Sequence, residues 1–214
     1  MPIWLDETFY VFITLLAMVN PIQAAAAFVT VTEGRSEEDQ AVIARRAAIV
    51  AGVSLMVFAF IGEALLKALG VEIGAFKIAG GLLLLRVAFN MVFAQDTAGQ
   101  TADRAKTSPL PASDPSVFPL AIPIITGPGA LTTSVALVYP TPAHPELNAG
   151  IFAVCATIVI FITYFFMRGA EGLTKWFGQT GVDAVGRIVG ILVAAIAVQL
   201  TINGITSLTS FTIR

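Results

Sequence analysis

Long apolar runs separated by short polar segments set the pattern of the chain. Six runs lie near the roughly 20 residues that a helix needs to cross a bilayer, and they cover residues 8–32, 47–69, 73–95, 117–139, 149–167 and 187–208. Apolar residues fill these runs instead of alternating with polar ones, which favours helices over strands. The pattern therefore predicts an all-α polytopic membrane protein with six transmembrane helices.

Two of the six runs carry a helix-breaking pair near their centre. Asn20-Pro21 interrupts the first run, and Gly127-Pro128 interrupts the fourth. Proline lacks a backbone N–H and clashes with the carbonyl four residues before it, but it is well suited to the first position of a new helix. We therefore expect the first and fourth helices to be broken, each with a second helix that begins at membrane depth.

Composition supports the membrane class and excludes several others. The chain is 57% hydrophobic and 12% charged, whereas about a quarter of the residues in a soluble domain are charged. The net charge of −2 gives no reason to expect a nucleic-acid partner, and one cysteine, Cys155, cannot form an intramolecular disulfide. No positive segment precedes the first run, so we expect no cleaved signal peptide.

The basic residues predict the orientation in the bilayer. The first, third and fifth connections and their edges hold Arg35, Arg45, Arg46, Arg104, Lys106, Arg168, Lys175 and Arg187. The opposite side has Lys67, Lys77 and Arg214. Since cytoplasmic loops carry the excess of Lys and Arg, we expect both termini to lie outside.

A short motif predicts an internal duplication. It places Glu, Lys and Gly at one spacing in two copies, Glu63, Lys67 and Gly70 in the first and Glu171, Lys175 and Gly178 in the second. Asn20-Pro21 and Gly127-Pro128 also lie at nearly the same position within their halves. Each half holds three predicted spans, so the second half enters from the opposite side, which predicts two inverted three-helix repeats. The expected units are residues 1–95, a cytoplasmic linker at 96–116, and residues 117–214.

Several segments together resemble the MarC family over essentially the whole chain. They are Asn20-Pro21-Ile22, residues 78–81 (IAGG), residues 119–123 (PLAIP) with 127–130 (GPGA), residues 187–192 (RIVGIL) and residues 195–199 (AIAVQ). The family includes SnatA-like transporters of small neutral amino acids. The resemblance implies transport of glycine, alanine or similar solutes across a bacterial or archaeal cell (inner) membrane. Gln23 stands where the family commonly has glycine, so the solute here is expected to be different or smaller.

The candidate substrate-binding residues follow from the two breaks. A helix start offers free N–H groups and a positive dipole end, which suit a carboxylate, and an unwound segment offers carbonyls to an ammonium group. The candidates are Asn20, Pro21, Ile22 and Gln23 at the first break and Thr126, Gly127, Pro128, Gly129 and Ala130 at the second. The alternative interpretation is a pair of packing kinks, because neighbouring helices can satisfy the freed groups.

Three polar residues deeper in the third and sixth runs are further candidates. Arg86 is costly to place in lipid, so it either contacts the substrate, reaches the cytoplasmic interface, or caps the end of a half-helix. Asn90 and Gln199 either line the pathway or join helices by hydrogen bonds. Gln199 and Asn203 are four residues apart and share one helix face.

The leading hypothesis is a secondary transporter with a small neutral amino acid as substrate and alternating access around a midplane site. The alternative is an uncoupled channel for a small polar solute, since half-helices that meet at their ends also build pores. No nucleophile–base pair, metal-ligand cluster or phosphate-binding loop is found in the sequence, so we expect neither an enzyme nor a cofactor. A proton and a sodium ion are both open as the coupling ion, and the residues do not indicate an oligomeric state.

Overall fold

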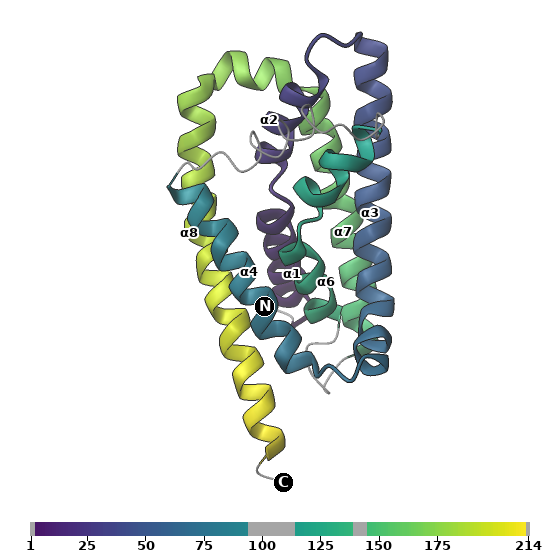
Figure 1. Cartoon of the computed structure of the whole chain (residues 1–214), viewed down its shortest axis with the longest axis vertical. Coiled ribbons are helices and arrows are strands. Elements are labelled where there is room, and N and C mark those ends of the chain that lie inside the picture. Colours follow the sequence, from purple (N-terminus) through teal and green to yellow (C-terminus); the bar gives the residue numbers. More distant parts are fainter. Residues whose placement is uncertain (1–2, 94–113, 139–144, 213–214) are drawn as a thin grey trace.

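The computed structural model describes residues 3–93, 114–138 and 145–212, and these form helices joined by short turns (Figure 1). The helices are α1 (Ile3–Val19), α2 (Pro21–Thr32), α3 (Glu37–Ala68), α4 (Ile73–Val92), η1 (Ser116–Ile125), α6 (Pro128–Val138), α7 (Pro145–Arg168) and α8 (Ala170–Thr212). No strand occurs in these described ranges. Most of the predicted linker lies outside them.

Five helical segments are long and apolar enough to cross a membrane. They are Leu5–Thr32, Glu37–Ala68, Ile73–Val92, Ala149–Arg168 and Ala184–Leu208. The fourth predicted run has no long helix, because η1 contains extended backbone at Phe118 and Ile122 and ends at Ile125. The apolar helix α6 that follows it has 11 residues. The all-helical membrane class is therefore confirmed, with five long spans in the described ranges.

Two segments that the sequence analysis treats as connections are mostly helical. Helix α3 begins at Glu37, where the Ser36 hydroxyl accepts a hydrogen bond from the Asp39 N–H at 3.2 Å. Helix α8 begins at Ala170 and continues for 43 residues, so most of the expected connection at residues 168–186 is helical, while the sixth apolar run lies within the candidate span Ala184–Leu208. The chain has no proline beyond Pro145. Isolated glycines cost only about 1 kcal/mol each, which tertiary packing overrides.

The helices form two packed bodies (Figure 1). One buried cluster joins α1, α2, α3, η1, α6 and α7, with Leu15, Leu55 and Phe152 at its centre. The second cluster is smaller and joins α4 to α8 around Leu84 and Val193. Helices α4 and α8 have their most extensive contacts with each other, while α4 meets the first body mainly at α6, and α8 meets it mainly at α2. The third helices of the two predicted halves thus pair with each other.

Glycines allow the close contacts of α4. Helices α4 and α8 run antiparallel, since Gly74 lies against Gly204, Gly81 against Thr201, and Gly190 against Met91. A Cβ atom built on Gly81 would lie 2.7 Å from the Ala197 carbonyl oxygen, a backbone atom that cannot move aside. The pairing therefore depends on small residues, as expected for helices that associate within a bilayer.

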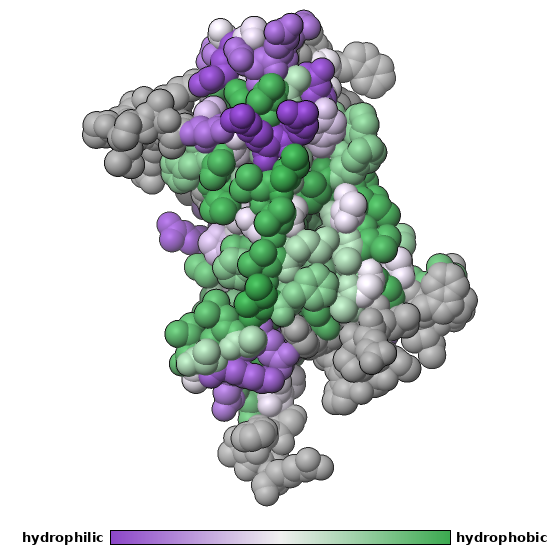
Figure 2. Space-filling view, turned by 90° about the vertical axis from the view of Figure 1, so that its right-hand side faces the viewer, coloured by the Kyte–Doolittle hydropathy of each residue, from purple (hydrophilic) through white to green (hydrophobic). Residues whose placement is uncertain are grey.

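The outer surface carries an apolar band. Figure 2 shows hydrophobic side chains across the middle of one face and hydrophilic ones toward both ends. Exposed large side chains contribute to the band from α3, α4, α7 and α8, among them Val53, Leu83, Phe161 and Ile191. Such outward-facing apolar residues suit a hydrocarbon environment, which favours a membrane-embedded protein.

An exposed ion pair joins the start of η1 to α3. Arg46 Nη1 lies 2.9 Å from Asp114 Oδ2. The Ser116 hydroxyl and N–H both donate to Asp114 Oδ1. Hydrogen bonding from Ser116, followed by the nearby Arg46 guanidinium, lowers the pKa of Asp114 below its ordinary value of 3.8. In the first copy of the predicted repeat motif, Lys67 Nζ lies 2.7 Å from Glu63 Oε1. The side chains of Glu171 and Lys175, in the second copy, fall outside the described residues.

Candidate functional site

The first helix breaks at Asn20, as the sequence predicts. Asn20 has φ 47° and ψ 78°, in the left-handed region, and Pro21 begins α2. Among non-glycine residues, asparagine adopts this conformation comparatively readily because its side chain bonds locally. The carbonyl of Ala17 loses its usual donor four residues later, since Pro21 has no N–H. The break is buried, with Asn20 only 5% exposed.

Gln23 completes the cap of α2. Its backbone N–H donates to Asn20 Oδ1 at 3.3 Å, and Asn20 Nδ2 donates to Gln23 Oε1 at 3.3 Å. This reciprocal arrangement resembles a capping box, in which the residue three positions into the helix bonds back to the cap. Gln23 therefore has a local structural partner, and Ile22 between them is half-buried. The sequence predicts Gln23 as a substrate-binding residue and as a change in the space available to solute, and its side-chain bond to Asn20 is a further role that the structure shows.

The second break separates η1 from α6. The N–H and the hydroxyl of Thr126 both donate to the Ala121 carbonyl, at 2.9 and 2.8 Å, which closes η1. Helix α6 then begins at Pro128. Gly127 precedes it and has no side chain, so it cannot cap α6 in the way that Asn20 caps α2. The first N–H groups of α6 are therefore without a cap from the preceding residue.

The two breaks lie at a similar height in the bundle (Figure 1). Helix α2 contacts η1, and α1 contacts α6, so the four half-helices form one continuous packed unit. Thr126 is 1% exposed, and Ala130 in the first turn of α6 is 3% exposed. The two groups of predicted residues thus lie at one level of the first body, where Asn20, Thr126 and Ala130 are buried while Pro128 is exposed.

Gly129 has a packing role within this layer. A Cβ atom at Gly129 would lie 2.1 Å from Leu84 Cδ2 on α4, and one at Gly80 on α4 would lie 1.9 Å from Thr132 Cγ2 on α6. Both contacts join α4 to α6. The start of α6 is therefore also the seam along which the two bodies meet.

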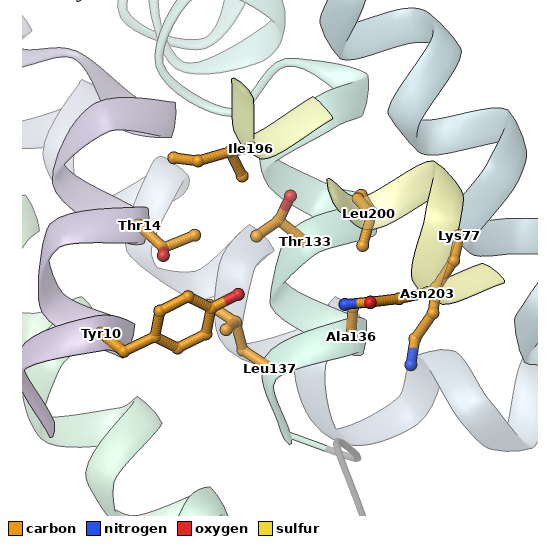
Figure 3. A pocket seen from close by; sticks show the side chains of 9 residues that line it. All are labelled: Tyr10, Thr14, Lys77, Thr133, Ala136, Leu137, Ile196, Leu200 and Asn203. Carbon is orange, nitrogen blue, oxygen red and sulfur yellow. The ribbon is translucent and has the colours of Figure 1, made fainter. Parts of the chain in front are cut away.

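A cavity of about 230 Å³ lies between the two bodies, beside this seam. Figure 3 shows Tyr10 and Thr14 of α1 and Thr133 of α6 on one side, and residues of α8 and Lys77 of α4 on the other. Ala136, Leu137, Ile196, Leu200 and Asn203 complete the lining. The volume is below the roughly 300–1,000 Å³ of sites for drug-sized ligands, so it suits a small solute.

The sequence analysis did not select these residues as a group. From the sequence, Lys77 enters only the charge balance, and Asn203 enters only as the neighbour of Gln199 on one helix face. A lysine five residues into an apolar helix, and a Tyr10–Thr14 pair on one face of α1, were the available indications. Their convergence depends on how α4 and α8 pack against α1 and α6, which no local pattern encodes.

A second cavity, of about 530 Å³, lies toward the opposite end of the bundle. It is formed where α2 ends, α3 begins and α7 ends, with Thr30, Glu33, Glu37, Gln40 and Arg168 among its lining residues. Tyr10 and Thr14 of the first cavity precede Asn20 by about two to three helical turns, and Phe28 to Thr32 follow it by a similar length. The buried breaks therefore lie between the two cavities along this helix pair.

None of the predicted site residues lines either cavity, and this holds for Arg86, Asn90 and Gln199 as well as for the residues at the two breaks. Arg86 is exposed on α4, next to Val87 and other outward-facing apolar residues. Asn90 is half-buried one turn further along. Gln199 is exposed on α8 and donates from Nε2 to Asn203 Oδ1 at 2.9 Å, which confirms that these two residues share a face. Gln199 thus reaches the first cavity only through Asn203.

Comparison with known proteins places the chain in a family. The MarC family, described as MarC family integral membrane proteins, matches residues 5–209. The UPF0056 membrane protein MJ1677 of Methanocaldococcus jannaschii is 31% identical over 194 residues, which cover 91% of this chain and 93% of the relative. The UPF0056 membrane protein YvbG of Bacillus subtilis is 33% identical over 193 residues, covering 89% and 90%. The UPF0056 membrane protein YhcE of Escherichia coli is 27% identical over 197 residues, covering 92% and 91%. No solved structure matches the chain.

Proposed function

This chain belongs to the MarC family of integral membrane proteins, and from that premise we propose that it is a secondary transporter for small neutral amino acids such as glycine and alanine. The observation that carries the proposal is the pair of buried helix breaks at one height, with a cavity toward each end of the bundle. Broken helices that meet in the interior are typical of substrate sites in transporters.

In this proposal the chain crosses the membrane six times, and η1 with α6 makes the fourth crossing as two half-helices. An even number of crossings agrees with the start of α1 and the end of α8, which both lie in the lower half of the view in Figure 1. The antiparallel pairing of α4 with α8 also agrees with an inverted repeat, because these are the third elements of the two halves. The distribution of Lys and Arg assigns both termini to the outside.

The central site uses the chemistry of the two breaks. The uncapped first turn of α6 supplies N–H donors and a positive dipole end for the substrate carboxylate. The Ala17 carbonyl, which has no helical donor, is an acceptor for the substrate ammonium group. A small substrate is favoured because alanines fill the first turns of α2, with Ala24 and Ala25 buried.

Alternating access follows from the division into two bodies. The pair α4 and α8 meets the first body along a seam that includes Gly80 and Gly129, where Thr132 packs on Gly80 and Leu84 packs on Gly129. Small movements of this pair would open one cavity to the central site and close the other. Packed interfaces of this kind switch between discrete arrangements, and the exchange would be driven by a proton or sodium gradient.

Uptake of labelled glycine or alanine into proteoliposomes tests the proposal. We expect saturable uptake with counterflow, and loss of both in Pro21→Ala, which allows α1 and α2 to join, and in Gly127→Leu, which obstructs the start of α6. Gly150→Leu is the matched control, because a side chain there meets nothing within 4 Å. Uptake by both break variants at the wild-type rate would remove the breaks from the mechanism.

The alternative is an uncoupled channel for a small polar solute. The same counterflow assay separates the two functions, since a channel gives no trans-stimulation and no turnover-limited flux. Glycine flux that stays proportional to its gradient up to high concentration would favour the channel.

A further inference from the structure

The cavity between α1, α4, α6 and α8 has the chemistry of an anion site. One of its nine lining residues, Lys77, carries a formal charge, and no carboxylate lines it. Among the described residues, the salt bridges are Arg46–Asp114 and Lys67–Glu63, so Lys77 has no described acidic partner within 4.0 Å. A cation on a half-buried side chain within an apolar helix is costly without a counter-charge. The cavity therefore favours a negatively charged occupant.

Thr133 provides a second and independent observation. Its side chain is 3% exposed, and its Oγ1 is inaccessible to solvent with no hydrogen-bond partner in the described structure. Buried hydroxyls are nearly always bonded, and an unbonded one indicates a missing partner. The neighbouring hydroxyls of Thr132 and Ser134 bond to carbonyls of their own helix at 2.8 and 2.7 Å, so Thr133 alone among these three adjacent residues has a hydroxyl without a partner in the described structure, and Thr133 is the one that lines the cavity.

Asn203 presents a donor to the same space. Its Oδ1 already accepts from Gln199 Nε2 at 2.9 Å. Figure 3 shows its amide nitrogen on the side toward Tyr10 and Thr133, with Lys77 beyond it at the margin of the cavity. Asn203 and Lys77 thus bring N–H donors to the cavity, and the hydroxyls of Tyr10, Thr14 and Thr133 can donate as well.

We propose that this cavity is a carboxylate-binding site, in which Thr133 and Asn203 donate hydrogen bonds and Lys77 supplies the charge from the rim. The inference rests on the proposed function in one respect: the carboxylate is that of the amino acid, held here before it reaches the helix breaks. The site is separate from the breaks because none of the residues at Asn20–Gln23 or Thr126–Ala130 lines it.

Binding to the purified protein in lipid nanodiscs tests the site with three probes: glycine, acetate and glycinamide, which lacks the carboxylate. We expect glycine and acetate to bind and glycinamide not to. Lys77→Met should weaken acetate binding by about tenfold or more, and Thr133→Val by about three- to tenfold, as expected for hydrogen bonds to a charged group. Lys77→Arg and Thr133→Ser should each restore most of the affinity.

Matched controls use groups that are already satisfied elsewhere. Lys67→Met removes a positive charge paired with Glu63, and Thr163→Val removes a buried hydroxyl that bonds to its own helix at 2.7 Å. Neither should change acetate binding. Glycinamide binding as tight as that of glycine, sodium binding that Thr133→Val abolishes, or acetate binding unaffected by Lys77→Met would each overturn the proposal.

Uptake measured on the same preparations separates this inference from the proposed function. Wild-type glycine transport together with acetate binding that is insensitive to both cavity variants would refute the cavity site alone. Acetate binding that depends on Lys77, without transport of any amino acid, would refute the transporter and leave the anion site in place.

Discussion

Replacing Asn20 by alanine and by glycine separates its two roles at the first break. Its Oδ1 caps α2, and its backbone lies in the left-handed region at φ 47°. Loss of a cap to alanine costs about 0.5–2 kcal/mol, and a left-handed conformation costs an ordinary residue about 1–2 kcal/mol. Asparagine already bears part of the cost of the left-handed conformation. We therefore expect Asn20→Ala to lower the free energy of unfolding by about 1.5–3 kcal/mol. Glycine adopts this conformation freely, and it replaces a capping residue at a cost of about a few tenths of a kcal/mol. Asn20→Gly should therefore lower the free energy of unfolding by less than about 1 kcal/mol.

Ser36 provides the matched control in the same chain. It caps α3 by accepting from the Asp39 N–H, but with φ −65° and ψ 155°, where alanine is unstrained. The assay is equilibrium unfolding in mixed micelles, followed by far-UV circular dichroism. The advantage of glycine over alanine should be larger at position 20 than at position 36 by about 1 kcal/mol. If the glycine variant exceeds the alanine variant in stability by the same amount at both positions, the assignment of backbone strain to Asn20 is refuted.

Two further predictions concern the seam and the polar end of the bundle. Gly80→Ala places a Cβ atom 1.9 Å from Thr132 Cγ2 and should destabilise by about 1–3 kcal/mol in thermal unfolding, whereas Gly150→Ala meets nothing and should stabilise α7 by up to about 1 kcal/mol. Because the pKa of Asp114 is lowered on folding, its contribution to stability is present above the ordinary aspartate value of 3.8 and is lost as the pH falls through the lower folded pKa. The difference in melting temperature between the wild type and Asp114→Asn should therefore disappear at acid pH, and a constant difference would contradict the assignment.

The helix breaks were predictable because their causes are local. Pro21 and Pro128 remove a donor wherever they stand in a helix, and both begin a helix in the structure. The Asn20–Gln23 bonds were also within reach of the sequence, since a cap and a residue three positions later form a known pair. The resemblance to a glycine-containing family motif directed attention to the volume of Gln23 instead of its hydrogen bonds.

The extent of α8 shows that a helix can begin well before its apolar run, which lies within the candidate span Ala184–Leu208. Residues 168–186 carry polar side chains and several glycines, which are typical of a connection. They continue as helix because no proline interrupts them and a glycine costs a helix only about 1 kcal/mol. Hydropathy locates the part of a helix that lies in lipid, but it does not locate the end of the helix.

The sequence by itself determined the membrane class and the positions of the two breaks, because each depends on apolar run length or on groups within one helical turn. Only the tertiary structure decided that α4 pairs with α8, that Gly80 and Gly129 lie on the seam between the two bodies, and that Lys77 and Thr133 share a cavity. Lys77 and Thr133 are 56 positions apart in the chain. Their proximity depends on side-chain packing between helices, whose contacts have no periodicity along one sequence.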